Sequence, residues 1–370
     1  MYTRLVILIF ILWCNTVSGE PVINNAPVVT AEHLAAPSAL RPCCAFGNGL
    51  KVKIGSLPVP FYRVDNIFSA DNPGHHQYND SHFAALAALS GLGCERNGII
   101  YTHHGGFIDI AHVRDTADNT FYLFTQIYPR LGLEWRLFLS EELGVRRIQL
   151  YSFTPPAMRA ERYRVSAWLA GQLAFQLAQW HEIAQWYGYQ SVSGFPEAIS
   201  AFSPEDLYSN LLGARLAIAV ILRGEAGSVT QYNNSMDARL SQALLRLGAV
   251  SRKETEERFS SVDGVWWNST RRVPDKYLVL RRNYDLRAQR QPLTVPGEDR
   301  KPYLLQLPGR VNGAVLSQLG ELEIYPGESM KALPSPAAFY APADFVQLAE
   351  IAKRADSLEH KQTGSRQVTR

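Results

Sequence analysis

The chain has 370 residues, of which 46% are hydrophobic and 19% charged, and its formal net charge is +3 at pH 7. This composition is typical of a folded protein with a substantial core and excludes an intrinsically disordered chain. The charge is far from the strongly basic balance that contact with a phosphate backbone requires, so we expect no nucleic acid among the partners.

The first 19 residues are typical of a secretory signal peptide. Arg4 precedes an apolar run over residues 5–13, and Val17-Ser18-Gly19 provides a cleavage site before Glu20. The run is too short for the roughly 20 apolar residues that cross a bilayer, and no later stretch is long enough. We therefore expect export, and a mature protein that is soluble in the periplasm and has no transmembrane segment.

Cysteine positions bear on both anchoring and cross-linking. Cys14 stands where bacterial lipoproteins are cut and acylated, but Trp13 occupies the preceding position, which requires a small residue, so a lipid anchor is the less favoured alternative. After cleavage the vicinal pair Cys43-Cys44 and Cys94 remain. In an oxidising compartment we expect one disulfide from this pair to Cys94, with Cys44 and Cys94 as candidates.

The first half of the chain alternates short patterns of both kinds. Residues 20–40 are rich in Pro, Ala and Asn without periodicity, which indicates a linker or surface strap. Alternating or apolar runs predict strands over residues 50–54, 98–102, 133–139 and 145–153, and helical spacing predicts helices over residues 81–89, 107–117 and 121–130. The strands at 133–139 and 145–153 are the best candidates for a small sheet.

The second half is dominated by helical patterns. These predict a long central helix over residues 154–187, capped by Gly188, and further helices over residues 203–222, 236–247 and 342–355. Short strands at 265–267 and 277–280 and a fraying polar tail at 356–370 complete the prediction.

The fold class is therefore helix-rich α+β, with long central helices packed on a small mixed or antiparallel sheet. We expect a main domain over residues 41–262, a strand and loop region packed on it over 263–341, and a C-terminal helix and tail over 342–370.

Histidines are concentrated in one stretch. Six of the nine lie between residues 75 and 112, namely His75, His76, His82, His103, His104 and His112. A strand that feeds a helix through Gly105-Gly106 is a common place for a site, because glycines allow a ligand to approach the backbone closely. On that helix the spacing of Asp109, His112 and Asp115 places them within about a third of the circumference. Such a face suits a metal or a proton relay.

Imidazole and carboxylate groups are the ligands of zinc and similar divalent cations in hydrolytic sites, where an open position holds a water whose pKa falls to about 7. His181 and Glu182 on the long helix would add a ligand and a general base. The zincin motif is incomplete, because Gln185 stands where its second histidine belongs. Any metal must therefore draw ligands from several segments.

We accordingly name His112, His181 and Asp109 as metal ligands and Glu182 as the general base. Asp115 is a further ligand or an orienting group. His104, Glu205 and Asp206 are additional candidates.

These residues also have structural interpretations. Capping alone explains Ser203-Pro204-Glu205-Asp206, with Ser203 as N-cap and Asp206 at the capping-box position. Asp115 and Asp118 are equally compatible with surface or capping roles, and His112 and His181 with buried, hydrogen-bonded histidines. Burial of such groups is costly unless they are paired, which keeps the functional interpretation open.

Several segments resemble a bacterial family catalogued as domain of unknown function 4056. They are Arg41–Gly47, Glu95–Gly98, Gly105–Asp115, Trp180–Ile183 and Phe202–Tyr208. The resemblance extends over nearly the whole mature chain and implies a bacterial, periplasmic setting. It implies no activity, substrate or cofactor.

Three functions follow as hypotheses. The first is a metal-assisted hydrolase acting on a component of the cell envelope, and the second is a non-catalytic envelope protein that binds a glycan, peptide or lipid fragment. The third is a cysteine hydrolase that uses Cys94 with His104 or His112. Zinc–nitrogen bonds are about 2.0–2.1 Å long, so imidazoles of His112 and His181 more than about 8 Å apart would exclude a shared ion.

Overall fold

A computed structural model describes residues 34–37, 41, 45–54, 57–79, 95–190, 197–327, 330 and 333–368. The predicted signal peptide, Cys14, Cys43, Cys44, Cys94 and the helix predicted over residues 81–89 lie outside these residues, and so does most of the predicted strap. No helix within the described ranges is long and apolar enough to cross a membrane.

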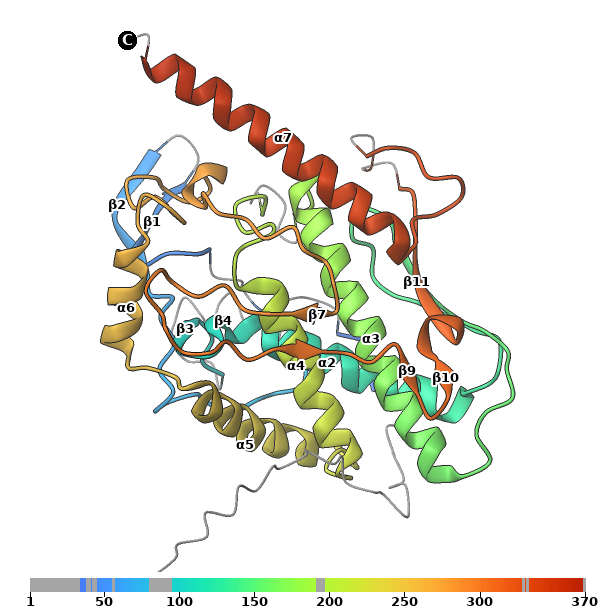
Figure 1. The fold of residues 1–370 in the computed structure, drawn as a ribbon. Helices are drawn as coiled ribbons and strands as arrows, with labels where there is room; N and C mark the ends of the chain where they lie inside the picture. Colours follow the sequence, from blue (N-terminus) through green and yellow to red (C-terminus); the bar gives the residue numbers. More distant parts are fainter. Residues whose placement is uncertain are drawn as a thin grey trace, which may run out of the picture.

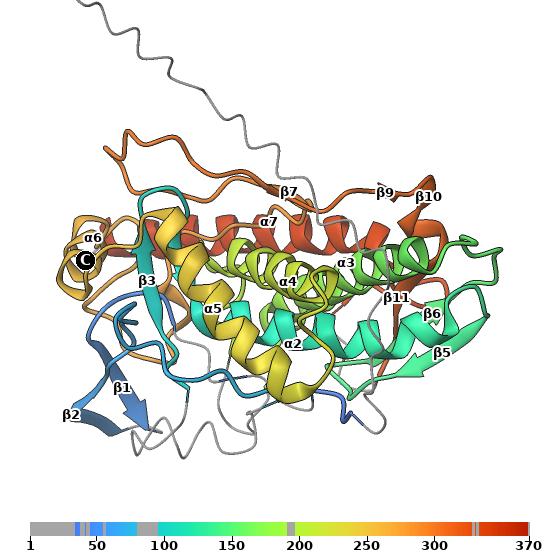
Figure 2. The ribbon, with the colours of Figure 1, turned by 90° about the horizontal axis from the view of Figure 1, so that it is seen from below.

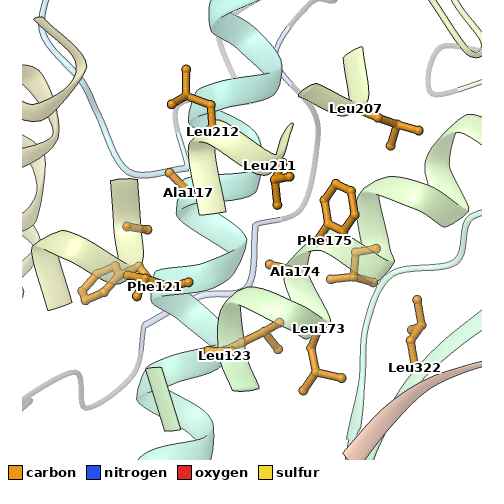
Figure 3. Close-up of a cluster of buried hydrophobic side chains, with 14 of the residues drawn as sticks. Ala117, Phe121, Leu123, Leu173, Ala174, Phe175, Leu207, Leu211, Leu212 and Leu322 are labelled. Carbon is orange, nitrogen blue, oxygen red and sulfur yellow. The ribbon is translucent and has the colours of Figure 1, made fainter. Parts of the chain in front are cut away.

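Three long helices form the centre of the molecule (Figures 1 and 2): α2 (Ile110–Ile127), α3 (Arg159–Trp186) and α4 (Asp206–Leu222). Nearly every residue of α3 from Tyr163 to Gln185 is buried, as expected for a helix without a charged face. Figure 3 shows the side chains at the contact, which come mainly from these helices: Ala117, Phe121, Leu123, Leu173, Ala174, Phe175, Leu207, Leu211 and Leu212. This packing places the start of α4 beside the start of α2.

Small antiparallel sheets lie at the two ends of the helical layer (Figure 2). At one end, β11 (Gly320–Tyr325), β6 (Val145–Leu150) and β5 (Trp135–Phe138) pair in that order. At the other end lies the hairpin of β1 (Leu50–Ile54) and β2 (Leu57–Val64). A second hairpin, β3 (Ile99–Thr102) with β4 (Gly106–Asp109), leads directly into α2.

Outer elements cover this centre. They are α5 (Val229–Leu247), α6 (Arg252–Ser261) and α7 (Pro342–Val368), together with the short strands β7 (Gln289–Arg290), β8 (Leu305–Gln306), β9 (Arg310–Val311) and β10 (Ala314–Val315), and the 3-10 turns Tyr128–Arg130, Lys276–Leu278 and Leu316–Gln318. The helix α7 packs against α3 and β11 (Figure 1). The predicted class, a helix-rich α+β fold with a small antiparallel sheet, is confirmed.

Several predicted boundaries were wrong for local reasons. The helix expected from residue 107 begins at Ile110, because residues 106–109 pair with β3 as a strand. Residues 107–117 and 121–130 were expected as separate helices, but α2 is continuous to Ile127. The long helix begins at Arg159 instead of 154, because Pro155 and Pro156 remain outside it.

The remaining differences lie in the second half. The helix α5 begins at Val229, where Ser228 caps it by accepting a hydrogen bond from the N–H of Gln231, and not at residue 236. The helix α6 was not predicted, and the strands predicted at 265–267 and 277–280 reduce to isolated bridges at Trp267. The predicted polar tail continues α7 to Val368.

Candidate metal centre

Three potential ligands meet where α2 and α4 begin. Asp109 ends β4 and caps α2, since its side chain accepts hydrogen bonds from the N–H groups of Ala111 and His112. His112 follows within the first turn, and Asp206 is the first residue of α4. One ligand atom from each of Asp109, His112 and Asp206 lies within 4.8 Å of the other two, and all three residues are buried. This spacing suits a single cation.

Two more carboxyl groups, Glu182 of α3 and Glu205, lie in the same region. Glu182 is fully buried; its Oε2 accepts a hydrogen bond of 2.5 Å from the N–H of Phe202, and its Oε1 has no hydrogen-bond partner. In Glu205, Oε2 accepts a 2.9 Å bond from the hydroxyl of Ser203, whereas Oε1 has no partner. Each carboxyl therefore leaves one buried oxygen unsatisfied, which is costly in a protein interior.

Asp206 is the least satisfied of these groups. Neither carboxylate oxygen has a hydrogen bond, although Oδ1 makes an ion-pair contact of 3.3 Å with Nε2 of His112. Burial, followed by repulsion from Glu182 and Asp109, raises the pKa of Asp206 well above its usual value. Burial, followed by the charges of Asp206 and Asp109, does the same to the pKa of Glu205. Both pKa shifts arise first from burial and then from the neighbouring carboxylates.

The neighbouring groups respond to this charge. Burial alone would lower the pKa of His112, but Asp109, Glu182 and Asp115 outweigh it and raise that pKa. Burial raises the pKa of Glu182 despite the opposing effect of His112 and His181. A divalent cation bound among these carboxylates would relieve the repulsion directly.

The segment that leads into α4 is held by a buried arginine. The guanidinium of Arg282 donates to the carbonyls of Ala198, Ile199 and Ala201, and its charge lies close enough to Glu182 and Asp206 to affect their pKa values. These bonds fix the segment that carries Phe202.

Phe202 has a left-handed backbone with φ +57°, which is rare for a bulky residue and persists only where the surroundings fix it. Its N–H bonds Glu182, and its carbonyl accepts a 2.7 Å bond from the N–H of Asn283. The strained residue therefore holds one oxygen of Glu182 in place.

His181 lies near this group but outside it. Its ring centroid is 6.5 Å from that of His112, and the ring planes are inclined by 53°. This separation is below the roughly 8 Å beyond which two imidazoles cannot share an ion. Its Nδ1 is in contact with the carboxylate of Glu142, which raises the pKa of His181 against the effect of burial. The two imidazoles are each 5% exposed, whereas Asp109, Glu182 and Asp206 are fully buried. The imidazole side is thus the side nearest to solvent.

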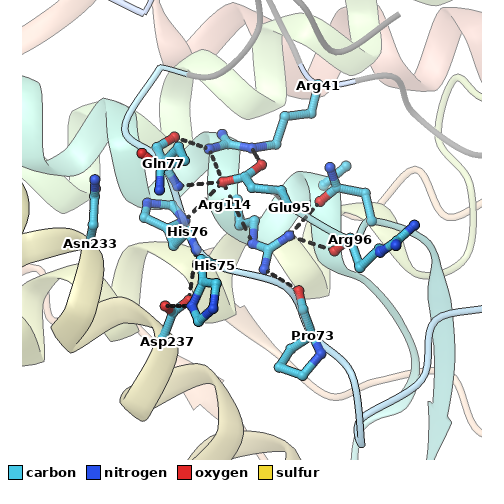
Figure 4. A network of polar contacts seen from close by, with 12 residues as sticks. Arg41, Pro73, His75, His76, Gln77, Glu95, Arg96, Arg114, Asn233 and Asp237 are labelled. Carbon is cyan, nitrogen blue, oxygen red and sulfur yellow. Dashed lines mark hydrogen bonds and ion pairs between the residues drawn. The ribbon is translucent and has the colours of Figure 1, made fainter. Parts of the chain in front are cut away.

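Asp115 follows His112 by about one turn of α2 but is paired with a separate ion network, part of which Figure 4 shows. Its Oδ1 accepts a 2.9 Å bond from Arg41, whose guanidinium also bonds Glu95 at 2.6 and 2.8 Å and Asp118 at 3.0 Å. Burial raises the pKa of Asp115 to about 6, although Arg41 opposes this. The surface or capping interpretation of Asp115 and Asp118 was wrong, since both are buried and paired.

The capping interpretation of residues 203–206 was also wrong. The hydroxyl of Ser203 donates to Glu205 and does not cap the helix. The N-cap residue is Glu205, whose side chain accepts no hydrogen bond from the N–H groups of the first turn. Both acidic residues turn into the interior. His104 lies at the turn of the β3–β4 hairpin, at the end opposite Asp109, and its Nδ1 contacts the carbonyl of Lys301.

Sequence reasoning missed Glu142, Phe202 and Arg282. Glu142 stands in what reads as an acidic turn, 39 residues before His181, so no local pattern links the two. Arg282 lies in an arginine-rich stretch that reads as a loop, and nothing in the sequence indicates that Phe202 is left-handed. Glu205 and Asp206 were named as candidates from the sequence, but capping also explained two acidic residues after a serine and a proline.

Comparisons with known proteins add the family. No curated protein matches the chain, and no solved structure does. The family resemblance predicted from five segments of the sequence is confirmed by a match that extends over residues 31–296. The chain belongs to the family described as Protein of unknown function (DUF4056).

Proposed function

We propose that this protein is a metal-dependent hydrolase of the bacterial cell envelope, with one divalent cation held by Asp109, His112 and Asp206. The observation that carries the proposal is the environment of Asp206: both oxygens are buried without a hydrogen bond, and one of them lies within 4.8 Å of ligand atoms from the other two residues. A buried carboxylate is stable when it is paired or bound to a metal, and among the described residues this one has an ion-pair contact of 3.3 Å with His112 but no hydrogen bond.

The ligand set suits hydrolytic chemistry. One imidazole and two carboxylates are a combination that zinc accepts in catalytic sites, and several other divalent cations tolerate it. A bound cation of this kind lowers the pKa of a coordinated water and polarises a carbonyl or phosphoryl oxygen. Glu182 is the general base, because its unpartnered Oε1 can take a proton while Phe202 holds Oε2.

The envelope setting rests on the signal-peptide pattern of the first 19 residues. Export would expose the protein to glycan, peptide and lipid components, and cleavage of a carbonyl or phosphoryl bond in one of them is the proposed reaction. Glu205 is a second carboxyl in the region whose raised pKa favours the protonated form. It could supply a proton to a leaving group.

A non-catalytic envelope protein is the second candidate, and burial favours it. Asp109, Glu182 and Asp206 are fully buried, and the imidazoles are each 5% exposed. An ion bound there could serve to join α2, α3 and α4 without meeting a substrate, as structural metal sites do. The two candidates share the ion and differ in the role of Glu182.

Metal analysis of purified protein tests the shared part. We expect one divalent ion per chain in the wild type and none in Asp206→Asn, which keeps the size of the side chain but loses its charge. The matched control is Asp118→Asn, a buried aspartate of α2 that lies in the Arg41 network, and it should keep the ion. A wild type that takes up none of zinc, manganese or iron would overturn the proposal.

Glu182→Gln separates the two candidates. If Glu182 is the general base, the variant keeps its metal and loses about 10²–10⁴-fold in the rate of hydrolysis of isolated envelope fractions. Metal binding that raises the melting temperature of a wild type with no hydrolytic activity on glycan, peptide or lipid fractions would instead support the non-catalytic protein.

A further inference from the structure

Glu142 joins the sheet to the proposed metal centre. It lies between β5 and β6, and it is 2% exposed. Its carboxylate has two partners: Oε1 contacts Nδ1 of His181, and Oε2 accepts a 2.7 Å bond from Arg146. Both oxygens are therefore directed, and the carboxylate cannot turn without breaking an ion pair.

The backbone of Glu142 makes a second connection to the same helix. Its carbonyl accepts a 2.9 Å hydrogen bond from Nε1 of Trp180, the residue before His181 in α3. One residue of the β5–β6 connection thus bonds two consecutive residues of α3, through its backbone and through its side chain. The bond from Trp180 fixes the turn against α3, and the contact with the carboxylate orients the imidazole.

The connection itself is tightly shaped. Leu143 is left-handed with φ +59°, and Glu142 donates its N–H to the carbonyl of Gly144 at 3.0 Å. A Cβ at Gly144 would lie 2.4 Å from the carbonyl oxygen of Tyr325, so the backbone of β11 leaves no room for a side chain there. Glu142 is consequently presented by a rigid turn.

We propose that Glu142 is a positioning residue of the metal centre. Its carboxylate holds the Nδ1–H of His181, so that Nε2 of His181 is left as a fourth ligand for the ion held by Asp109, His112 and Asp206. This inference rests on the proposed function. Two imidazoles that share an ion through bonds of about 2.0–2.1 Å have ring centroids about 5 Å apart at a tetrahedral angle and about 6.4 Å apart on opposite sides of the ion. His112 and His181 are 6.5 Å apart, so the two rings must approach by about 1 Å to share a tetrahedral ion. Carboxylates that bind the second nitrogen of a ligating histidine fix its tautomer and strengthen it as a ligand.

The test is divalent metal affinity in Glu142→Gln, measured with zinc in competition with a chelator. We expect affinity to fall about 10–100-fold, as is usual for the group behind a ligating histidine. The matched control is Glu323→Gln: Glu323 is also buried, also paired with an arginine of β6, Arg147, and lies on β11 away from the imidazoles. It should lose stability comparably and keep wild-type affinity. Equal affinities in Glu142→Gln and the wild type would overturn the inference.

A second measurement does not depend on the variant or on metal. Nitrogen-15 NMR of the metal-free wild type, above the pKa of the imidazolium, should show His181 protonated at Nδ1 and bare at Nε2. The opposite tautomer would overturn the positioning role, even in a protein that binds metal. A protein that shows the expected tautomer but takes up no divalent ion would refute the proposed function and leave the contact as purely structural.

Discussion

Buried carboxylates in this molecule fall into two opposite classes. Asp118 has four partners, namely Arg41, His76, Asn79 and Tyr232, at 2.9 to 3.0 Å. Neither carboxylate oxygen of Asp206 has a hydrogen-bond partner. Burial is complete for both, so the difference lies in what the fold provides around them. A satisfied carboxylate contributes to stability, whereas an unsatisfied one lowers it, and such groups are concentrated at functional sites.

Asp118 predicts a specific loss of stability in acid. Burial by itself would raise its pKa, but Arg41 and His76 outweigh that effect and lower it to about 2, from about 3.9 in an unfolded chain. A lowered pKa means that the stabilisation is present above pH 3.9 or so and disappears as the pH falls towards about 2.

We therefore expect the free energy of unfolding to differ most between wild type and Asp118→Asn near neutral pH, and the difference to shrink by about 2 kcal/mol in acid. Urea unfolding at several pH values measures this. A difference that is the same at pH 6 and pH 3 would contradict it.

For Asp206 we expect the opposite effect: substitution should stabilise the metal-free protein and abolish metal binding. In metal-free protein, burial, followed by repulsion from Glu182 and Asp109, raises the pKa of Asp206, so the folded state carries the cost of burying or protonating this carboxyl; Asp206→Asn removes that cost, and the free energy of unfolding should rise by about 1 kcal/mol or more. In the presence of zinc the wild type should become the more stable of the two, because only it binds the ion. Thermal unfolding with and without zinc shows whether the order of melting temperatures inverts; the same order in both conditions would count against a metal centre.

The contact between α2 and α4 is the element on which the centre depends, since it brings Asp109 and His112 to Asp206. Gly213 of α4 makes this contact possible: a Cβ there would lie 2.1 Å from the carbonyl oxygen of Val113, a backbone atom that cannot rotate away. Gly171 of α3 differs, because its added Cβ would meet the end of the Ile218 side chain at 2.4 Å, and that side chain can adopt another rotamer.

Gly213→Ala should therefore force α2 and α4 apart, lower the free energy of unfolding by about 1–3 kcal/mol and weaken zinc binding. Gly171→Ala is the control, with a smaller effect on stability and unchanged zinc affinity. Denaturant unfolding and metal titration of both variants provide the measurement. If the two glycines behave alike, the close approach of α2 and α4 does not govern the centre.

Local sequence patterns predict the helices and strands better than they predict the residues of the candidate metal centre. The three-residue spacing of Asp109 and His112 predicted a shared face, because both lie at the start of one helix. Asp206 could be listed as a candidate, but a helix start rich in acidic residues looks the same whether it faces solvent or core. Glu142 was beyond reach, because its partner His181 is brought to it by tertiary packing alone. Helix boundaries failed where a strand pair or a proline competed with helical spacing, as at residues 106–109 and 155–156.

At the scale of the whole molecule, the packed core includes residues beyond the end of the family match. The match ends at residue 296, whereas β11 pairs with β6 over six residues and α7 packs on α3. Trp180, which bonds Glu142, has its ring centroid 6.0 Å from that of Tyr340 and 5.6 Å from that of Phe345. The C-terminal segment therefore covers the same part of α3 that carries His181 and Glu182.

A chain that ends at residue 296 should consequently fail to fold cooperatively. Its truncation would expose Trp180 and one edge of β6 and would remove Asp356, which accepts a 3.1 Å bond from Trp186 and a 2.6 Å ion-pair contact from Lys276. Apolar surface exposed in this way costs about 25 cal/mol per Å², and the net stability of a domain is only about 5–15 kcal/mol, so we expect the truncation to prevent cooperative folding. A chain that ends at residue 359 is the control, since it keeps each of these contacts. Near-ultraviolet circular dichroism and zinc titration compare the two; a sharp thermal transition with wild-type zinc affinity in the shorter chain would mean that residues 31–296 form the centre unaided.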